Sequence, residues 1–313
     1  MKAIVIRFSS LGDVVLSTAV VESLSDAGWE VGFVTLPKYC DIFKNDPRIS
    51  KIFPFDGFRS TAQDIKDFSP DLIVDLHKNQ RSILLSAMID AKKIRADKRN
   101  IERRLLVALK IGDRSPKSIV DVQLKTIEKM GMSAEGYLPK IFPTRYGIKF
   151  AAEKLKNLKK PIAMLHSGAR HSLKNWGDER FKRLAELLED KGFSIVFLSQ
   201  SDVFDGFFQS GELSLEELIG VIQQADCFVG NDSGPVHIAA ALGVPSLSIF
   251  GPTHPALGFI PRGKNADYIT ADLKCSPCTL HGEGKCKFER QLCFEKITPE
   301  MVLHKVIELM KGG

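Results

Sequence analysis

Short apolar runs alternate with amphipathic helical stretches along the chain, and this alternation constrains the fold more than any other feature. Apolar runs of this length suit strands of a parallel sheet that is buried on both faces. In the first half they predict strands over 2–8, 30–36, 51–55, 71–77 and 92–96. Helices are predicted between and after them, over 13–26, 38–44, 60–67, 79–89, 99–110 and 117–131. Such alternation predicts a parallel sheet covered by helices on both faces.

The second half restarts the same pattern. Strands are predicted over 161–166, 194–199, 227–229, 246–250 and 267–270. Helices are predicted over 178–190, 214–224, 235–242 and 298–310. The segment 133–160, with its glycines, prolines and lysine-rich end, breaks the pattern and predicts a domain junction. We therefore expect an α/β protein of two doubly wound domains, 1–150 and 151–313, facing across a cleft where ligands bind. The last helix could pack back on the first domain.

Length and apolar content fit a soluble two-domain chain of 313 residues, since domains commonly hold about 100–200 residues. No apolar run approaches the ~18 residues of a membrane span. The apolar run before Arg7 is too short for a secretory signal, so we expect a cytoplasmic protein. Disulfides are not expected in that compartment.

The positive charge is concentrated in one segment. Residues 78–117 hold 12 Lys and Arg against 4 Asp and Glu, a local excess of +8, whereas the whole chain carries +6. This basic segment predicts an anionic partner: nucleic acid, a membrane surface or a phosphorylated acceptor. The alternative is a solvated, charged helix face. Aromatic residues do not interleave the cations, which argues against single-stranded nucleic acid.

The stretch from Asn231 to His237 predicts a phosphate cradle. It follows the strand at 227–229, and the turn at Asp232, Ser233 and Gly234 leads into a helix that Pro235 begins. The free N–H groups and positive dipole end of that helix favour an anion. His237, in the first turn, could add a donor. The alternative is an ordinary strand–turn–helix corner, which any α/β protein contains.

The loop after the strand at 161–166 carries two further cations. Small residues at 167–169 allow the backbone to approach a phosphate, and Arg170 and Lys174 could neutralise it. Trp176 is better explained as a packing residue of the following helix. In the first domain, Asp13 follows the turn at Gly12, where it could cap the helix or accept a proton from an attacking hydroxyl.

The cysteines near the C-terminus are Cys275, Cys278, Cys286 and Cys293. The first pair has the spacing of a zinc knuckle, but the second pair does not. Plain thiols are favoured over a structural zinc site. The sequence has no P-loop, no HExxH and no GxSxG motif.

Taken in order, these motifs resemble the ADP-heptose:lipopolysaccharide heptosyltransferase family, glycosyltransferase family nine. The resemblance rests on Arg7 with Gly12-Asp13, on 75–77, on 166–176, on 231–237 and on 250–253. It implies a GT-B fold, two Rossmann-like domains with the active site between them. It also implies an inverting transfer of heptose from ADP-heptose to the lipopolysaccharide inner core, on a Kdo or heptose acceptor. No metal or other cofactor is implied.

The resemblance also assigns roles to residues. Asp13 matches the general base, and Lys174 matches the lysine on the donor diphosphate. The remaining donor-binding residues it indicates are Gly168, Arg170, Asp232, Ser233, Gly234 and His237. An anionic lipopolysaccharide precursor would meet the basic region, through His77, Lys78, Arg81, Arg99 and Arg103. This implies a protein of the cytoplasm that could sit peripherally on the inner membrane, with no nucleic-acid partner.

Two departures from the family pattern bear on the donor. Gly168 and Ala169 stand where the family often has Thr or Ser, and 198–202 lacks the glutamate expected for the ribose. Gln200, Ser201 or Asp202 could replace it. The alternatives are a glycosyltransferase using another nucleotide sugar, a nucleotide-sugar epimerase and a non-catalytic polyanion-binding protein.

Overall fold

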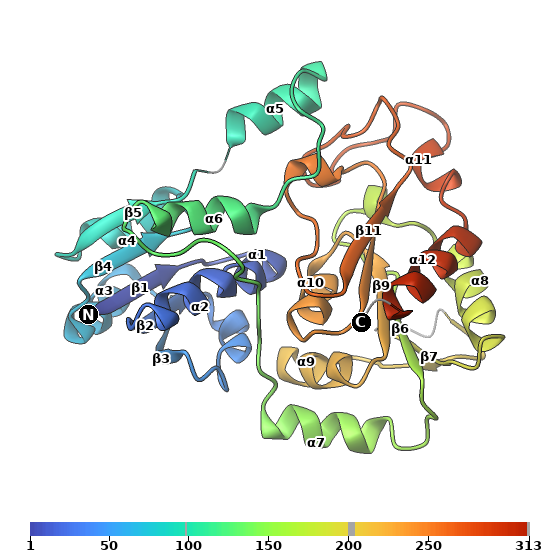
Figure 1. The fold of residues 1–313 in the computed structure, drawn as a ribbon, viewed down its shortest axis with the longest axis horizontal. Coiled ribbons are helices and arrows are strands. Elements are labelled where there is room, and N and C mark those ends of the chain that lie inside the picture. The colour runs from blue at the N-terminus through green and yellow to red at the C-terminus, as the bar shows by residue number, and fades with distance from the viewer. Residues whose placement is uncertain (98, 200–203, 312–313) are drawn as a thin grey trace. The chain divides into compact units, whose positions relative to one another are not determined.

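The computed structural model describes residues 1–97, 99–199 and 204–311. The chain divides into two compact units. The N-terminal unit comprises Met1–Lys98 and Ile119–Thr144, and the C-terminal unit comprises Arg99–Ser118 and Arg145–Gly313. Figure 1 shows the ribbon of each unit.

The N-terminal unit is built on a five-stranded sheet with the order β3-β2-β1-β4-β5. Every neighbouring pair is parallel. In chain order the strands are β1 (Lys2–Ile6), β2 (Glu30–Thr35), β3 (Ile49–Pro54), β4 (Leu72–Asp75) and β5 (Lys92–Arg95). The helical segments are α1 (Leu11–Leu16), α2 (Thr18–Asp26), η1 (Pro37–Ile42), α3 (Phe58–Phe68), α4 (Gln80–Ala87) and α6 (Ile119–Glu128).

Both faces of this sheet are covered, because alternate residues of β1 point to opposite sides. Ile4 and Ile6 lie in one core with Ile65 of α3 and Leu85 of α4. Val5 is also fully buried, on the other face, and α2 packs on α6 and β2 (Figure 1). This is the helix-covered parallel sheet that the alternating pattern predicts.

The C-terminal unit contains a six-stranded sheet with the order β11-β10-β9-β6-β7-β8, again parallel throughout. The strands are β6 (Ile162–His166), β7 (Ser194–Phe197), β8 (Phe208–Gln209), β9 (Cys227–Asn231), β10 (Ser246–Phe250) and β11 (Ala266–Thr270). The helical segments are α5 (Asn100–Leu109), α7 (Arg145–Lys154), η2 (Ser172–Lys174), α8 (Asp178–Glu189), α9 (Leu215–Gln223), α10 (Gly234–Ala241), η3 (Pro255–Leu257), α11 (Leu292–Glu295) and α12 (Pro299–Lys311).

The main core of this unit lies under α8 and α12. Leu184 of α8 and Val302 and Val306 of α12 share it with Val229 and Ile249 of the sheet. Val302 and Val306 of α12 therefore pack within the C-terminal unit. No helix among the described residues is both long and apolar enough to cross a membrane.

The division of the chain differs from the predicted boundary at 150/151 in two places. First, α7 lies inside the segment 133–160, where no helix was expected. It packs on α9 so closely that a Cβ on Gly220 would lie 2.1 Å from the carbonyl oxygen of Gly147. Glycine at both positions permits this approach, and it also weakens the helical signal in the sequence.

Second, 99–118 leaves the N-terminal unit and docks on the other. Leu106 of α5 packs with Ala256 and Leu257, and the N–H of Lys117 donates to the carbonyl of Pro255. The residue pattern of 99–118 does not distinguish a helix that docks on the other unit from an ordinary crossover helix.

Candidate functional site

The order of the second sheet creates a switch point between β6 and β9. The chain leaves β6 toward β7 on one side and returns to β9 on the other. Loops after two such strands diverge and leave a crevice at their carboxyl ends, where ligands bind in open α/β sheets. The predicted donor residues at 166–176 and 231–237 follow these two strands.

Asn231, the last residue of β9, joins the two loops. It is fully buried. Its side-chain oxygen accepts from the N–H of Trp176 at 3.1 Å, and its side-chain nitrogen donates to the carbonyl of Ser167 at 2.6 Å. Trp176 is itself buried and donates to the carbonyl of Ile297, which confirms its packing role. The sequence singled out this motif but did not indicate that Asn231 holds the loops together.

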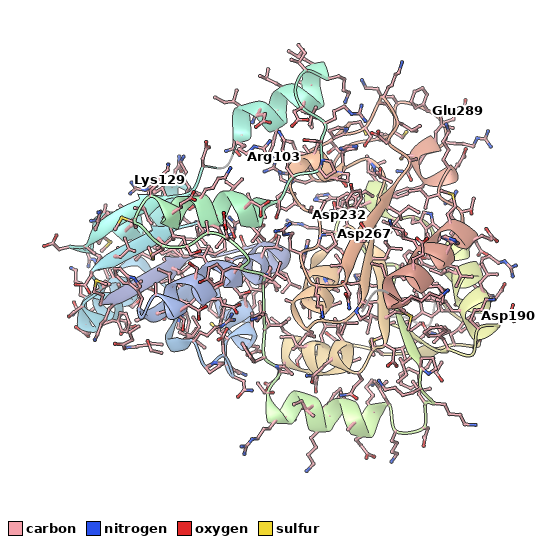
Figure 2. The ribbon with its side chains drawn as sticks, in the orientation of Figure 1. Arg103, Lys129, Asp190, Asp232, Asp267 and Glu289 are labelled. Atoms are coloured by element: carbon pink, nitrogen blue, oxygen red, sulfur yellow. The ribbon has the colours of Figure 1, made fainter. Side chains whose placement is uncertain are left out.

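Lys174 and Asp232 form an ion pair in this crevice. Lys174 Nζ lies 2.8 Å from Asp232 Oδ2, and the side chains are only 15% and 8% exposed. The hydroxyl of Thr253, in the loop after β10, donates to the same carboxylate oxygen at 2.8 Å. Figure 2 labels Asp232 near the end of β9. The pair brings together two residues that sequence reasoning placed at the donor site.

The helix α10 begins directly beside this pair. Ser233 is its N-cap in extended backbone, and Gly234 is the first helical residue. Pro235 is therefore second, not first as predicted, and still needs no backbone donor. The hydroxyl oxygen of Ser233 is buried and has no hydrogen-bond partner among the described residues. A buried, unsatisfied hydroxyl at a helix N-terminus suits an anionic ligand with acceptor oxygens. His237 is buried in the first turn.

Gly168 leaves space beside the partly buried imidazole of His166. A Cβ on Gly168 would lie 2.8 Å from His166 Cε1. The other side of that ring faces the carbonyl of Leu198, 3.1 Å from Nδ1. Burial lowers the pKa of His166, which keeps the ring neutral at physiological pH. Arg170 is exposed and makes no ion pair with a described residue. The ribose candidates Gln200, Ser201 and Asp202 lie outside the described residues.

The cysteine-containing loop packs against the base of this site. A Cβ on Gly282 would lie 2.5 Å from Lys174 Cγ, so the loop backbone touches the aliphatic part of the lysine. Gln291 donates to the carbonyl of Leu173 at 2.9 Å, and Ser276 Oγ donates to the carbonyl of Gly251 at 2.9 Å. The loop thus supports both Lys174 and the segment after β10. Sequence reasoning missed this role, because the signal is a single glycine in a loop.

All four cysteines of this loop line one small pocket, and each is a free thiol. Burial raises the pKa of Cys293 to about 11, so that thiol is protonated at neutral pH. Within 1–97, 99–199 and 204–311, no three His, Cys, Asp or Glu side chains are grouped so that they could hold a metal ion.

Asp13 lies in the N-terminal unit, in the first turn of α1 at the carboxyl end of β1. Its Oδ2 accepts from the N–H and the hydroxyl of Ser10, at 3.1 and 2.7 Å. Its Oδ1 lies 2.6 Å from Arg7 Nη2. Burial raises the pKa of Asp13, but Arg7 and the two Ser10 hydrogen bonds outweigh it and hold the pKa below its ordinary value. Asp13 is thus an ionised carboxylate at the third position of α1, where it completes a capping box with the N-cap Ser10.

The predicted acceptor residues fall in both units. In the N-terminal unit, Lys78 and Arg81 are exposed where β4 leads into α4, and His77 packs on Phe8. Buried Asp75 orders this turn, since its Oδ1 accepts from the N–H groups of His77 and Lys78, at 3.0 and 2.7 Å.

Arg99 and Arg103 belong to the C-terminal unit and have structural partners there. Arg99 pairs with Glu102, with 2.5 Å between Nη2 and Oε1. Arg103, labelled in Figure 2, lies over the ring of Phe259, with its guanidinium carbon 4.7 Å from the centroid. The predicted acceptor set is therefore not one cluster within either unit.

Two doubly wound parallel-sheet units, the second with a switch point between β6 and β9, are the architecture of a glycosyltransferase of the GT-B fold. The model of glycosyltransferase family 9 (heptosyltransferase) matches residues 58–288. The chain belongs to this family.

Individual relatives agree with this assignment. Lipopolysaccharide heptosyltransferase 1 of Pseudomonas aeruginosa is 23% identical, with 96% of each chain covered. The solved family 9 glycosyltransferase of Veillonella parvula has a TM-score of 0.79 at 20% identity, covering 100% of this chain and 98% of that one. Escherichia coli heptosyltransferase WaaC, solved with ADP, has a TM-score of 0.70 at 19% identity, covering 99% and 100%. It has also been solved with ADP-2-deoxy-2-fluoro heptose.

Proposed function

We propose that this glycosyltransferase moves a heptose from ADP-heptose to the inner core of lipopolysaccharide, on a Kdo or heptose residue, with inversion at the anomeric carbon. The observation that carries the proposal is the position of Lys174 beside the start of α10. Lys174 pairs with Asp232, the residue before the N-cap Ser233, so a cation, the buried Ser233 hydroxyl and the first N–H groups of α10 are neighbours, and such groups bind a diphosphate. The ligands named for the Escherichia coli relative support an ADP-sugar as the donor.

Inversion requires an in-line attack by the acceptor hydroxyl on the anomeric carbon. In the proposal, Asp13 accepts the hydroxyl proton as the new C–O bond forms. Its lowered pKa keeps it in the ionised form that a base needs at neutral pH. Arg7 and Ser10 hold the carboxylate in place. Ionised Asp13 is both the acidic partner of the N-cap Ser10 in the capping box of α1 and the proposed base, and the two roles are compatible.

The leaving ADP gains negative charge as the glycosidic bond breaks. Lys174 and the first N–H groups of α10 would meet that charge, and Arg170, exposed on the neighbouring loop, would add to them. With these groups in place, we propose that the reaction needs no metal and no other cofactor. Gly168, Asp232, Ser233, Gly234 and His237 complete the proposed donor site.

The acceptor would be an anionic lipopolysaccharide precursor at the cytoplasmic face of the inner membrane. Exposed Lys78 and Arg81, with His77, are the proposed contacts in the N-terminal unit. The curated relatives named as lipopolysaccharide heptosyltransferases support this class of acceptor.

Calorimetric titration with ADP, UDP and GDP, with and without EDTA, tests the donor. Selective ADP binding that survives EDTA is the expected result. Preference for UDP or GDP would instead favour a glycosyltransferase of the same fold with another donor. Absence of binding to all three nucleotides would contradict the proposed site.

Asp13→Asn tests the base, because the amide keeps the shape of the side chain. We expect kcat to fall by roughly 10²–10⁴-fold with ADP affinity unchanged. Full activity in this variant would contradict the assignment of Asp13.

A further inference from the structure

The helix α5 presents two apolar faces, and only one of them is buried. Leu106 is 3% exposed in its cluster with Ala256 and Leu257. Arg103 stacks on Phe259, and Lys117 pairs with Glu102 of the helix. These contacts dock one side of α5 on the C-terminal unit and fix which side faces outward.

The outward side carries large aliphatic residues in one row. Ile101, Leu105 and Leu109 are 78%, 42% and 60% exposed, and they follow one another at four-residue intervals along one helix face. Ile111, just beyond the helix, is 61% exposed. Exposed Arg104 lies beside this row. A contiguous exposed aliphatic patch is uncommon on a soluble monomer, and such a patch marks a surface that binds a protein or a membrane.

A further exposed apolar side chain lies in the cysteine-containing loop of the same unit. Phe288 is 50% exposed, and exposed Lys285 and Lys287 precede it. Lys287 is close enough to Lys110, at the end of α5, that its charge adds to burial in lowering the pKa of Lys110. Lys110 in turn donates to the carbonyl of Pro277, so the loop and α5 are joined.

Cations accompany both apolar elements. In the loop, exposed Lys285 and Lys287 directly precede Phe288, while Arg290 pairs with Glu295 and two exposed carboxylates, Glu283 and Glu289, lie nearby in the chain. The acidic residue of α5, Glu102, is neutralised by Arg99 and Lys117. Burial of aliphatic and aromatic side chains with cations at their rim is how peripheral proteins bind a bilayer whose headgroups are anionic.

We propose that the outward face of α5, together with Phe288, docks this protein on an anionic lipid bilayer. Ile101, Leu105, Leu109 and Phe288 enter the boundary between headgroups and acyl chains, while Arg104, Lys285 and Lys287 contact anionic headgroups. The inference rests on the proposed function only in that a membrane-held acceptor gives the docking a purpose. Lipid binding itself is measurable without any transfer reaction.

Co-sedimentation of the full chain with vesicles of phosphatidylglycerol and phosphatidylethanolamine tests the docking. The wild type should pellet with these vesicles and not with vesicles of phosphatidylcholine alone. The double variant Leu105→Gln, Leu109→Gln should bind at least tenfold more weakly. Ile148→Gln on α7 is the matched control, since Ile148 is 40% exposed in the same unit and α7 lies away from α5 (Figure 1). It should bind like the wild type.

ADP titration shows whether each variant retains its folded C-terminal unit. If the double variant loses ADP binding, Ile101→Gln replaces it, because Ile101 is the most exposed residue of the row. The docking would be overturned if the wild type stayed in the supernatant or bound both kinds of vesicle equally. It would also be overturned if the α5 variants bound vesicles as strongly as the wild type. So would a wild-type dimer that the double variant converts to a monomer without any vesicle binding.

The two proposals fail in different ways. Loss of vesicle binding with intact transfer to a soluble acceptor would overturn the docking and leave the function standing. Intact vesicle binding with no transfer to any acceptor would overturn the function and leave the docking.

Discussion

Lys174 Nζ lies 2.8 Å from Asp232 Oδ2, and this contact joins the loop after β6 to the start of α10. The lysine is thereby held, largely buried, beside the N-terminal end of α10. Asp232 also accepts from Thr253, so the carboxylate connects three loops at the carboxyl edge of the sheet. A bound diphosphate would find its cation already in position.

Removing this cation should weaken donor binding. Lys174→Gln is expected to raise the Kd for ADP by about tenfold or more, since a hydrogen bond to a charged group contributes about 1.5–3 kcal/mol. Lys182→Gln on α8 serves as the control, because Lys182 is an exposed lysine of the same unit. Calorimetry on both variants checks the effect, and equal ADP affinity in Lys174→Gln and wild type would refute the assignment.

Gly282 should affect the donor site through Lys174. Gly282→Ala places a Cβ 2.5 Å from Lys174 Cγ at a φ of +98°. Gly284→Ala has a similar φ of +89° but open space around the new Cβ. Both variants should lose roughly 1–2 kcal/mol of stability from backbone strain, but only Gly282→Ala should weaken ADP binding. Equal ADP affinities in the two variants would show that the loop does not position the lysine.

The ion pair of Asp13 with Arg7 and its hydrogen bonds with Ser10 predict a pH dependence of stability. The folded pKa is lowered, so the contribution of Asp13 is present above its unfolded pKa and is lost as pH falls through the lowered folded pKa. At pH 7, Asp13→Asn should reduce the free energy of unfolding by about 1–3 kcal/mol. The difference from wild type should shrink in acid. Denaturant titrations at several pH values measure it, and a difference that grows toward low pH would contradict the ion pair.

Chelation tests whether the cysteine-containing loop depends on metal. With plain thiols, EDTA should leave the Tm and the ADP affinity unchanged. A fall of several degrees in Tm, with zinc released into solution, would instead favour the structural zinc site that the spacing of Cys275 and Cys278 allowed.

The sequence predicted most strands and helices, because apolar runs such as 3–6 and 246–250 are buried on both faces of their sheets. It did not predict α7 or the short strand β8. The helix α7 packs closely against Gly220 of α9, and β8 is a two-residue edge strand. The residue pattern within each segment does not show that α7 packs on α9 or that β8 pairs with β7.

In the candidate site too, the sequence predicted local features and missed contacts between distant residues. The strand–turn–helix corner at 227–241 was recognisable, since a strand, a turn and a helix N-terminus are contiguous in the chain. The supporting roles of Asn231, Thr253 and Gly282 were not, because each acts on a residue at least 20 positions away. Arg99 and Arg103 were predicted as acceptor contacts from the resemblance and the basic segment, and the structure gives each a local partner, Glu102 and Phe259, that the sequence did not indicate.

The central claim is transfer of heptose from ADP-heptose to a lipopolysaccharide acceptor. Mass spectrometry of heptose-deficient lipopolysaccharide, incubated with ADP-heptose and the protein in EDTA, tests it most directly. The account predicts an acceptor heavier by one heptose, and this product should be nearly absent with Asp13→Asn. An unchanged acceptor, or conversion of the ADP-heptose when no acceptor is present, would contradict the account.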